Sequence, residues 1–429
     1  MRKSRITRAG SCGRSQVKKR VFLFLLSLVL IACAGAQAAD NTAFSDRSWG
    51  THLHDAERTN SAPGALTLPP AREWTKSIAS VFSLFRVRPQ AEFVTSPAVY
   101  KGSIYVGSKD GRFYAFDLDS GKDMWKFKPA SGVDGPATAS EGMVCFGSIE
   151  GVLYCVQRES GREIWRFKAR SEITSSPVIA DERVYFSSSD DRVYALDKSA
   201  GEKIWTYTHN SASYVASRLD ASPAVWGGRL YVMFNDGWLV CLDSRTGAEV
   251  WKKDVLNGNM LTLRGRRTPY LYEGLVYVID DKGWVIALDA VSGEEKARYD
   301  IVRAVDFIVT KKDIYIAGHE LLVALGRPSG RISWTAELSH GEPYSMAFSE
   351  GHIFVLSNFA STPFDIRFLE RDHGYIAAYT ADGGAQTWGV KLRETVHSSV
   401  ALASNHIALV TTNGVLHVFG TANTPASTD

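Results

Sequence analysis

Short runs of alternating apolar and polar residues, separated by turn-forming residues, dominate the chain from residue 93 onward. The first complete unit is Phe93–Trp125, with runs around Ser96–Tyr100, Ser103–Gly107, Arg112–Asp117 and Lys122–Trp125. Glycine and aspartate stand between these runs, where tight turns require them. The pattern predicts four short antiparallel strands in the unit.

The unit recurs along the rest of the chain at a spacing of roughly 40 residues, which is typical of β-propeller blades. The seventh unit carries an insertion, Phe359–His373, in its second hairpin, and the eighth has only three strands. The repeats predict an all-β, eight-bladed propeller. The later units span Val133–Trp165, Ile173–Trp205, Arg218–Trp251, Arg264–Ala297, Val302–Trp334, Glu342–Trp388 and His397–Gly420.

The missing strand of the eighth unit has a candidate replacement near the N-terminus. Glu73, Trp74 and Thr75 resemble an isolated fourth strand, because Trp closes the fourth strand in most units. Pairing this segment with the eighth unit removes the exposed sheet edges that invite aggregation. We therefore expect the N-terminal strand to close the ring.

Large and small residues recur at matched positions, and we interpret them as core. Neighbouring blades must pack against each other on both faces, so a large residue on one needs a small one opposite. Asp197, Asp243 and Asp289 also recur once per unit, which favours turn capping over acid–base chemistry. The core series are Trp125, Trp165, Trp205, Trp251, Trp334 and Trp388; Tyr105, Tyr185, Tyr231, Tyr277 and Tyr315; and Ala115, Ala195, Ala287 and Ala324.

Charge is concentrated at the N-terminus. The first 33 residues carry eight basic residues and no acidic one, whereas the whole chain has a net charge of +3, which leaves −5 (3 − 8) for the rest. A mildly acidic body gives no reason to expect a nucleic-acid partner. The apolar run 21–34 that follows is too short for a comfortable membrane span and suits a secretory signal.

Two processing sites overlap at the end of this signal. Ala36-Gln37-Ala38 fits signal peptidase cleavage before Ala39, while Leu30-Ile31-Ala32-Cys33 resembles a bacterial lipobox, in which Cys33 becomes the acylated first residue. The expected organisation is a signal peptide with lipobox (1–33), a tether (34–71), the eight-bladed propeller (72–420) and a C-terminal tail (421–429).

Three cysteines remain in the folded part, too few for a disulfide-built scaffold. Cys145 and Cys155 stand in the second and third strands of the second unit, and symmetry of the hairpin about Glu150 places them directly opposite each other. A disulfide and a pair of buried free thiols are both compatible with this placement. Cys241 faces Tyr231 by the same counting and is expected to stay reduced.

No catalytic motif, phosphate-binding loop or metal-ligand spacing is evident in the sequence. The repeat SPAVYKGSIYVGSKDGRFYAFDLDSGKDMW does resemble the repeat of pyrroloquinoline-quinone (PQQ) propellers over about Trp74–Gly420. One branch of that superfamily, the quinoprotein dehydrogenases, uses calcium and a disulfide between adjacent cysteines, and this chain has no adjacent cysteines. The other branch is the outer-membrane assembly factor family, which combines a lipobox with eight such repeats and no cofactor.

The resemblance to the assembly factors extends to one loop. Leu261, Leu263 and Arg264 in the string LTLRG look like the segment with which that family docks on the BamA-like barrel protein. The acidic residues that the family places beside it are only partly present: the next connection offers Asp306, and the preceding one offers Arg218 and Asp220. The resemblance thus implies these six residues as a partner-binding set.

The resulting expectation is a non-enzymatic, cofactor-free lipoprotein on the periplasmic side of the outer membrane. Its implied partners are a BamA-like barrel, other members of the assembly complex and unfolded outer-membrane proteins. A periplasmic PQQ-dependent dehydrogenase and a general periplasmic interaction protein remain the alternatives.

Overall fold

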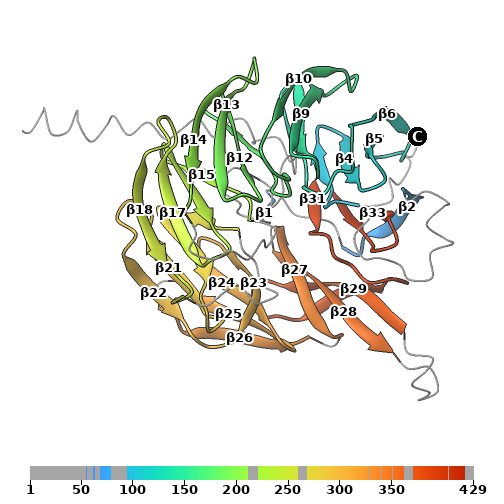
Figure 1. The fold of residues 1–429 in the computed structure, drawn as a ribbon. Coiled ribbons are helices and arrows are strands. Elements are labelled where there is room, and N and C mark those ends of the chain that lie inside the picture. Colours follow the sequence, from blue (N-terminus) through green and yellow to red (C-terminus); the bar gives the residue numbers. More distant parts are fainter. Residues whose placement is uncertain are drawn as a thin grey trace, which may run out of the picture. The chain divides into compact units, whose positions relative to one another are not determined.

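The computed structural model describes residues 55, 61–62, 68–78, 94–210, 221–258, 268–327, 329–338, 340–349, 351–361, 371–403 and 405–420. The chain divides into two units, Met1–Thr42 and Ala43–Asp429, and every described residue belongs to the second. That unit consists of eight antiparallel blades arranged as a β-propeller (Figure 1), which confirms the predicted fold.

Each of the first four blades contains four strands that follow one another in sequence. Blade one contains β3 (Ala98–Tyr100), β4 (Ser103–Ser108), β5 (Arg112–Asp117) and β6 (Asp123–Phe127); blade two, β7 (Thr138–Ser140), β8 (Met143–Gly147), β9 (Val152–Gln157) and β10 (Glu163–Lys168); blade three, β11 (Val178–Ala180), β12 (Arg183–Ser188), β13 (Arg192–Asp197) and β14 (Lys203–Thr208); blade four, β15 (Ala224–Trp226), β16 (Arg229–Met233), β17 (Trp238–Asp243) and β18 (Glu249–Asp254).

The second half of the ring departs from this regularity in blades seven and eight, each of which takes a strand from the N-terminal segment. Blade five contains β19 (Tyr270–Tyr272), β20 (Leu275–Ile279), β21 (Val285–Asp289) and β22 (Glu295–Tyr299); blade six, β23 (Ala304–Val309), β24 (Asp313–Gly318), β25 (Leu321–Gly326) and β26 (Ile332–Glu337); blade seven, β27 (Glu342–Ser349), β28 (His352–Ser361), β29 (Arg371–Thr380) and β30 (Gln386–Lys391), with β1 (Ser61–Ala62); blade eight, β31 (Ala401–Ala403), β32 (His406–Val410), β33 (Val415–Gly420) and β2 (Ala71–Ser77).

Burial changes systematically from the inside of a blade to its outside. The first strands of neighbouring blades contact one another and form the inner ring. The second strands are almost wholly buried, as in β8, because neighbouring blades cover both faces. Along the outer strand β10, Trp165 is the only buried residue, and exposed and half-buried residues surround it. The hydrophobic core therefore lies between blades.

The N-terminal strand closes the ring as the sequence predicts. Strand β2 pairs antiparallel with β33, with Trp74 opposite Val418, and completes blade eight. The Trp74 indole donates a hydrogen bond to the carbonyl of Leu118 in blade one, at 2.9 Å. The first and last blades are thereby joined through side chains as well as through the shared sheet.

A tryptophan holds most of the seams between blades in the same way. Its indole Nε1 donates to a backbone carbonyl in the turn between the third and fourth strands of the next blade, at 2.8–3.1 Å. Its ring covers the glycine of that turn so closely that a Cβ there would meet ring carbons at 2.5–2.8 Å. The pairs are Trp74–Gly121, Trp125–Gly161, Trp165–Gly201, Trp205–Gly247, Trp251–Gly293 and Trp334–Gly384.

The recurring turn aspartates act as caps, as predicted. The Oδ1 atom of Asp243 accepts the backbone N–H groups of Arg245 and Thr246 and the hydroxyl of Thr246. Asp197 and Asp289 make the corresponding bonds in their own turns. These hydrogen bonds lower the pKa of Asp197, Asp243 and Asp289.

The Ser-Pro motifs at the start of the first strands have a role that the sequence does not reveal. Their hydroxyls link neighbouring blades around the inner ring: Ser176 N–H donates to Ser222 Oγ, Ser222 N–H to Thr268 Oγ1, and Ser399 N–H to Ser96 Oγ, at 2.9–3.2 Å. The motif thus supplies a hydroxyl acceptor for a backbone donor at the centre of the ring.

In blade two, the equivalent positions are one residue later than the sequence pattern suggests. Gly135 and Pro136 align with Ser-Pro in the sequence. In the structure, Thr138 pairs with Cys145 as Ala98 pairs with Tyr105, so Pro136 and Ala137 occupy the Ser-Pro positions. The hydroxyl of Thr138 forms a different link between blades, because it donates to the carbonyl of Pro177 in blade three at 2.5 Å.

The segment expected to be a tether contributes a strand of its own. Strand β1 pairs in parallel with β27, with Ser61 opposite Phe348, on the side of β27 away from the rest of its blade. Since β27 is the innermost strand, β1 lies at the centre of the ring, where Figure 1 labels it. Two residues with no alternation give no strand signal, so the sequence does not predict this pairing.

The insertion in blade seven lengthens the hairpin between the second and third strands. Strands β28 and β29 each have ten residues, and their pairing continues through Phe359 opposite His373 to Ser361 opposite Arg371. The tip, 362–370, lies outside the described residues. In the part of the chain that the structure describes, no helix is long and apolar enough to span a membrane.

Candidate docking face

One face of the ring carries two kinds of connection side by side. In an antiparallel blade, the turn between the second and third strands and the connection to the next blade lie at the same end. Backbone hydrogen bonds join them: His209 N–H donates to Asp191 O and Val255 N–H to Gly237 O, both at 2.9 Å, and Ala304 N–H to Gly283 O at 2.7 Å. We call this side the connection face.

Two long connections, 209–223 and 255–269, flank blade four on the connection face, whereas the connection between blades two and three is only 169–177. Five of the predicted docking residues fall within them, in the stretches 211–220 and 259–267, which lie outside the described residues. These residues are Arg218, Asp220, Leu261, Leu263 and Arg264. The structure describes the stems from which both connections leave the ring.

The stem of the first connection is fixed by a histidine. His209 is 8% exposed, its Nε2 lies 2.8 Å from Asp236 Oδ2, and its ring stacks on Phe234 with centroids 4.2 Å apart. Burial raises the pKa of the neighbouring Asp191, whereas the charge of His209 opposes that rise. The chain therefore leaves blade three from a fixed point between the turns of blades three and four.

The stem of the second connection is held from both sides. Val255 and Leu256 are buried, and the Asn257 amide donates to Asp281 Oδ1 at 3.1 Å. At the far end, Thr268 is buried and accepts the Ser222 N–H in the inner ring. The described residues on both sides of 259–267 are thus fixed on the blades, and rigid elements of this kind commonly present binding loops.

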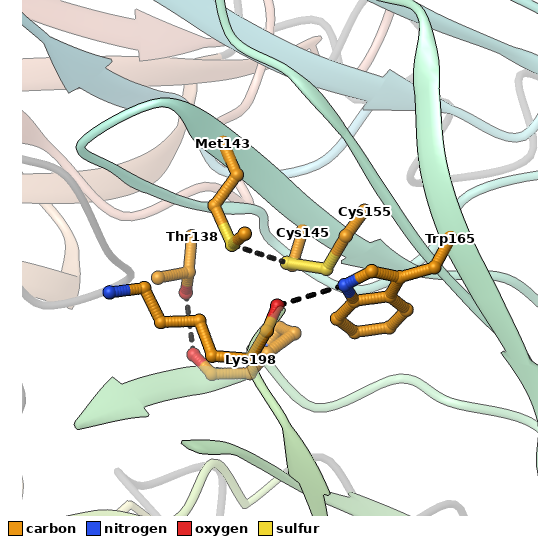
Figure 2. Close-up of a disulfide and its surroundings, with 7 residues drawn as sticks. Thr138, Met143, Cys145, Cys155, Trp165 and Lys198 are labelled. Atoms are coloured by element: carbon orange, nitrogen blue, oxygen red, sulfur yellow. Dashed lines mark hydrogen bonds between the residues drawn. A yellow bond between two sulfur atoms is a disulfide. The ribbon is translucent and has the colours of Figure 1, made fainter. Parts of the chain in front are cut away.

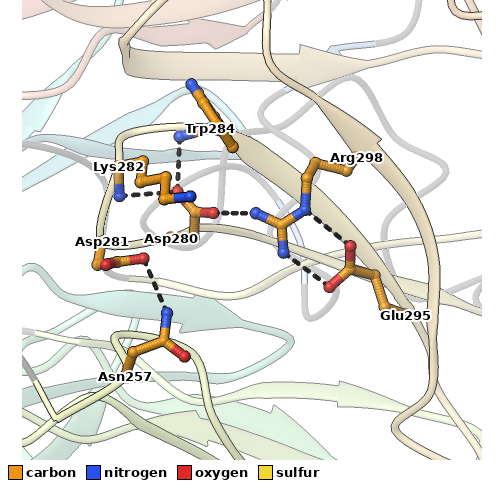
Figure 3. Close-up of polar contacts among 7 residues, drawn as sticks. All are labelled: Asn257, Asp280, Asp281, Lys282, Trp284, Glu295 and Arg298. Atoms are coloured by element: carbon orange, nitrogen blue, oxygen red, sulfur yellow. Dashed lines mark hydrogen bonds and ion pairs between the residues drawn. The ribbon is translucent and has the colours of Figure 1, made fainter.

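A charged and aromatic platform adjoins this second stem (Figure 3). The buried Asp280 accepts the N–H groups of Lys282 and Trp284, both at 2.9 Å, and pairs with Arg298. Arg298 also forms a two-bond pair with Glu295, at 2.8 Å for each bond, which lowers the pKa of Glu295. Lys282 Nζ lies 4.6 Å from the Trp284 ring centroid, so an indole and cations lie together beside the connection.

Asp306, the sixth residue of the predicted docking set, lies within the inner ring. Its side chain is 3% exposed, and its carboxylate accepts the N–H of Phe307 at 2.9 Å and of Met346, in blade seven, at 2.7 Å. Asp306 occupies the position that serine has in most of the other blades, and its longer side chain reaches a backbone donor across the seam. The buried carboxylate thus makes these hydrogen bonds inside the propeller, and the docking role of Asp306 stays a prediction.

The two cysteines of blade two are opposite each other, as the counting about Glu150 predicts. The structure joins Cys145 and Cys155 as a disulfide, with Cα atoms 4.2 Å apart, beside the Trp165 indole and its bond to Lys198 O (Figure 2). Cys241 lies opposite Tyr231 and is a buried free thiol. Burial raises its pKa to about 11, so the thiol stays protonated at neutral pH.

The remaining predicted site, Cys33, lies outside the described residues. Among the described residues, no group of three or more His, Cys, Asp or Glu side chains is placed to hold a metal ion.

Comparison of the sequence with known protein families identifies the family of this chain. The sequence profile of the family described as "Outer membrane protein assembly factor BamB" matches residues 82–132, 109–317 and 317–424. The chain belongs to this family. No curated protein sequence matches the chain.

Solved structures show the same fold at low sequence identity. BamB from Moraxella catarrhalis is 15% identical, with a TM-score of 0.62 over 82% of this chain and 99% of that one. Quinohemoprotein alcohol dehydrogenase from Comamonas testosteroni is 13% identical, with a TM-score of 0.68 over 91% and 84%. A europium-containing methanol dehydrogenase is 12% identical, with a TM-score of 0.64 over 88% and 99%. The fold is thus shared by assembly factors and quinoprotein enzymes.

Proposed function

We propose that this protein is a non-catalytic scaffold of the machinery that assembles β-barrel proteins in the outer membrane. The observation that carries the proposal is the match of the BamB family profile across all eight blades. In this role, the protein is held on the periplasmic side of the outer membrane by a lipid on Cys33. It binds a BamA-like barrel protein within the assembly complex and assists unfolded outer-membrane proteins.

The proposed docking residues are those of the two long connections on either side of blade four. Leu261 and Leu263 supply apolar contact area, and Arg264 supplies a forked donor for a carboxylate or backbone carbonyls. Arg218 and Asp220, in the other connection, add charges of both signs. The fixed stems at His209 and Asn257 support this assignment, because a loop with anchored ends loses less conformational entropy on binding.

Co-purification with a BamA-like barrel protein tests the docking site. The double variant Leu263→Ala, Arg264→Ala is expected to lose capture of the barrel while its thermal unfolding stays unchanged. Arg245→Ala is the matched control, since it removes an exposed cation from a turn at the opposite end of blade four. Capture that survives in the double variant contradicts the docking assignment, and so does a loss that accompanies unfolding.

The alternative, a PQQ-dependent dehydrogenase, is motivated by the dehydrogenase structures that share the fold. Addition of PQQ and Ca²⁺ to the purified protein distinguishes the two functions. A stable absorbing complex with dye-reducing activity toward alcohols would support the enzyme. Its absence, together with capture of the barrel protein, supports the scaffold, and absence of both would favour a general interaction protein.

The membrane anchor has a separate test. Lipidation leaves Cys33 as the mature N-terminus, and several acyl chains hold a protein on a membrane more firmly than one chain does. We expect Cys33→Ala to release the protein into the periplasmic fraction, with the native form sedimenting with outer membranes. A native N-terminus at Ala39 in soluble protein would overturn this part of the proposal.

A further inference from the structure

The seam between blades five and six differs from the six seams that a tryptophan holds. Ala297 occupies the tryptophan position, paired with Ala287 as Trp125 is paired with Ala115. Among the described residues, a Cβ on Gly330, the turn glycine of blade six, would meet only Tyr299 Cε1 within 4 Å, at 3.9 Å. We call the space beside Gly330, Ala297 and Tyr277 the vacant indole position.

The other parts of a standard seam are present. At the seam between blades one and two, Arg158 lies over the Tyr100 ring at 5.7 Å, and its carbonyl accepts the Trp125 indole. At the seam between blades five and six, Arg327 takes the place of Arg158 and lies over the Tyr272 ring at 4.8 Å. The seam therefore retains the turn glycine and the backbone position of the acceptor, shares its arginine with the seam between blades one and two, and lacks the indole.

A buried hydroxyl marks the same place. The hydroxyls of Tyr185, Tyr231 and Tyr315 each donate to the carbonyl that also accepts the seam tryptophan. Tyr277 is the equivalent residue; it is fully buried, and its hydroxyl has no hydrogen-bond partner among the described residues. The Tyr105 hydroxyl shares this lack although its seam contains Trp125, so only at Tyr277 does an unpaired hydroxyl coincide with a missing ring.

Blade five has no indole at the Ala297 position, but it carries a large aromatic side chain on its innermost strand instead. Tyr270 stands where Ala98 and Ala224 stand in blades one and four. Its hydroxyl donates to Val309 O at 2.6 Å and accepts Val309 N–H at 3.1 Å, which ties blade five to the first strand of blade six. Blades five and six are therefore joined at their inner strands, although no indole stands at the outer strand of blade five.

We propose that the vacant indole position binds an aromatic side chain, with tryptophan preferred, presented by an extended segment of an unfolded barrel client. This inference rests on the proposed function. Indole is the ligand that the same construction already binds within this chain at six seams, through ring contact with glycine and a donated N–H. Strands of transmembrane barrels carry aromatic girdles and alternate in polarity, so an unfolded client presents such rings along extended chain.

The test measures binding of a fluorescent ten-residue peptide of alternating threonine and tryptophan to the full-length protein, by anisotropy. Ala297→Trp fills the position from within and is expected to weaken binding by about tenfold or more, a difference that anisotropy resolves readily. Lys296→Trp is the matched control, because residue 296 is an exposed neighbour, and binding should be retained. A peptide with leucine in place of tryptophan should bind more weakly to the native protein.

A second variant keeps the test decisive if Ala297→Trp fails to fold. Tyr277→Phe removes only the unpaired hydroxyl, so it should weaken peptide binding severalfold without lowering thermal stability. Equal binding by native protein and both variants, or equal binding of the leucine peptide, overturns the inference. Capture of the barrel protein should be unaffected by Ala297→Trp, so failure of this inference is distinguishable from failure of the docking proposal.

Discussion

Two seams differ in where their large aromatic side chain lies. The seam between blades one and two has it on the outer strand, and the seam between blades five and six has it on the inner strand. In the first, the large ring is outermost: Trp125 covers Gly161 and donates to Arg158 O, while the inner strand carries Ala98. In the second, the outer position holds Ala297, and the large ring is the inner Tyr270.

The two seams together show that a large aromatic side chain can stand on the outer strand at one seam and on the inner strand at another. Dense packing requires volume to be conserved across facing positions. Blade two makes a different substitution within its own sheet, where a disulfide between Cys145 and Cys155 replaces the Tyr–Ala pair of blade one. A closed ring tolerates such local exchanges because every blade is supported from two sides.

The largest expected effect comes from removing the outer ring where it is used. Trp125→Ala should lower the free energy of unfolding by about 3–5 kcal/mol, since it deletes a buried ring and leaves a cavity over Gly161. Guanidinium unfolding followed by far-UV circular dichroism measures the change. Ala297 already stands at this position in the seam between blades five and six. A cost below about 1 kcal/mol for Trp125→Ala would show that the seam between blades one and two does not need its indole either.

Removing the disulfide should have the next largest effect on stability. Replacing both Cys145 and Cys155 with alanine opens a loop of ten residues and is expected to lower the free energy of unfolding by about 2–3 kcal/mol. Mass spectrometry of the non-reduced protein checks the bond itself, with Cys241 as the internal free-thiol control. Free thiols at both positions would remove the reason for the effect.

Tyr270→Phe removes the two hydrogen bonds between Tyr270 and Val309 and keeps the aromatic ring. The substitution leaves both backbone groups of Val309 without their partner, which should cost about 1–3 kcal/mol. Tyr277→Phe is the matched control in the same blade, because its hydroxyl has no partner among the described residues, and it should leave the free energy of unfolding unchanged or slightly raised. Equal costs for the two variants would contradict the assignment of Tyr270 as the inner support.

The smallest difference in stability is expected between alanine variants of the two turn glycines, Gly161 and Gly330. Gly161 and Gly330 have similar positive φ angles, 69° and 63°, so alanine carries the same backbone strain at both sites. Only at Gly161 does the new Cβ also meet an indole, at 2.5 Å. Gly161→Ala should therefore be less stable than Gly330→Ala by about 1 kcal/mol or more in paired thermal melts. Indistinguishable melting temperatures would mean that the indole over Gly161 is not what separates the two seams.

The sequence predicts the blades well because each hairpin repeats a register that turn glycines and alternating core residues define. Closure by Trp74 is predictable for the same reason, since an eighth blade with three strands requires a fourth. The parallel pairing of Ser61 and Ala62 with β27 is not, because two residues carry no periodicity.

The candidate site is less accessible to sequence reasoning. Asp306 appears as an unpaired acidic residue in a connection, yet it fills the inner-ring position of serine and binds Met346 N–H across a seam. The consequence of Ala297, a turn glycine that no indole covers, is likewise seen only when its seam is compared with the other seams in three dimensions. Stem residues such as His209 and Asn257 carry no motif, because their partners, Asp236 and Asp281, lie in other turns.

We propose that this propeller docks on a BamA-like barrel protein through the connections on either side of blade four. The most direct measurement of this docking is the dissociation constant between the full-length protein and the purified periplasmic domains of that partner, by calorimetry at fixed salt. We predict saturable binding by the native protein and by Arg245→Ala, and a loss of about a hundredfold or more for Leu263→Ala, Arg264→Ala, as expected when two central contacts are removed. Equal affinity for all three proteins, or no binding by the native protein, would contradict it.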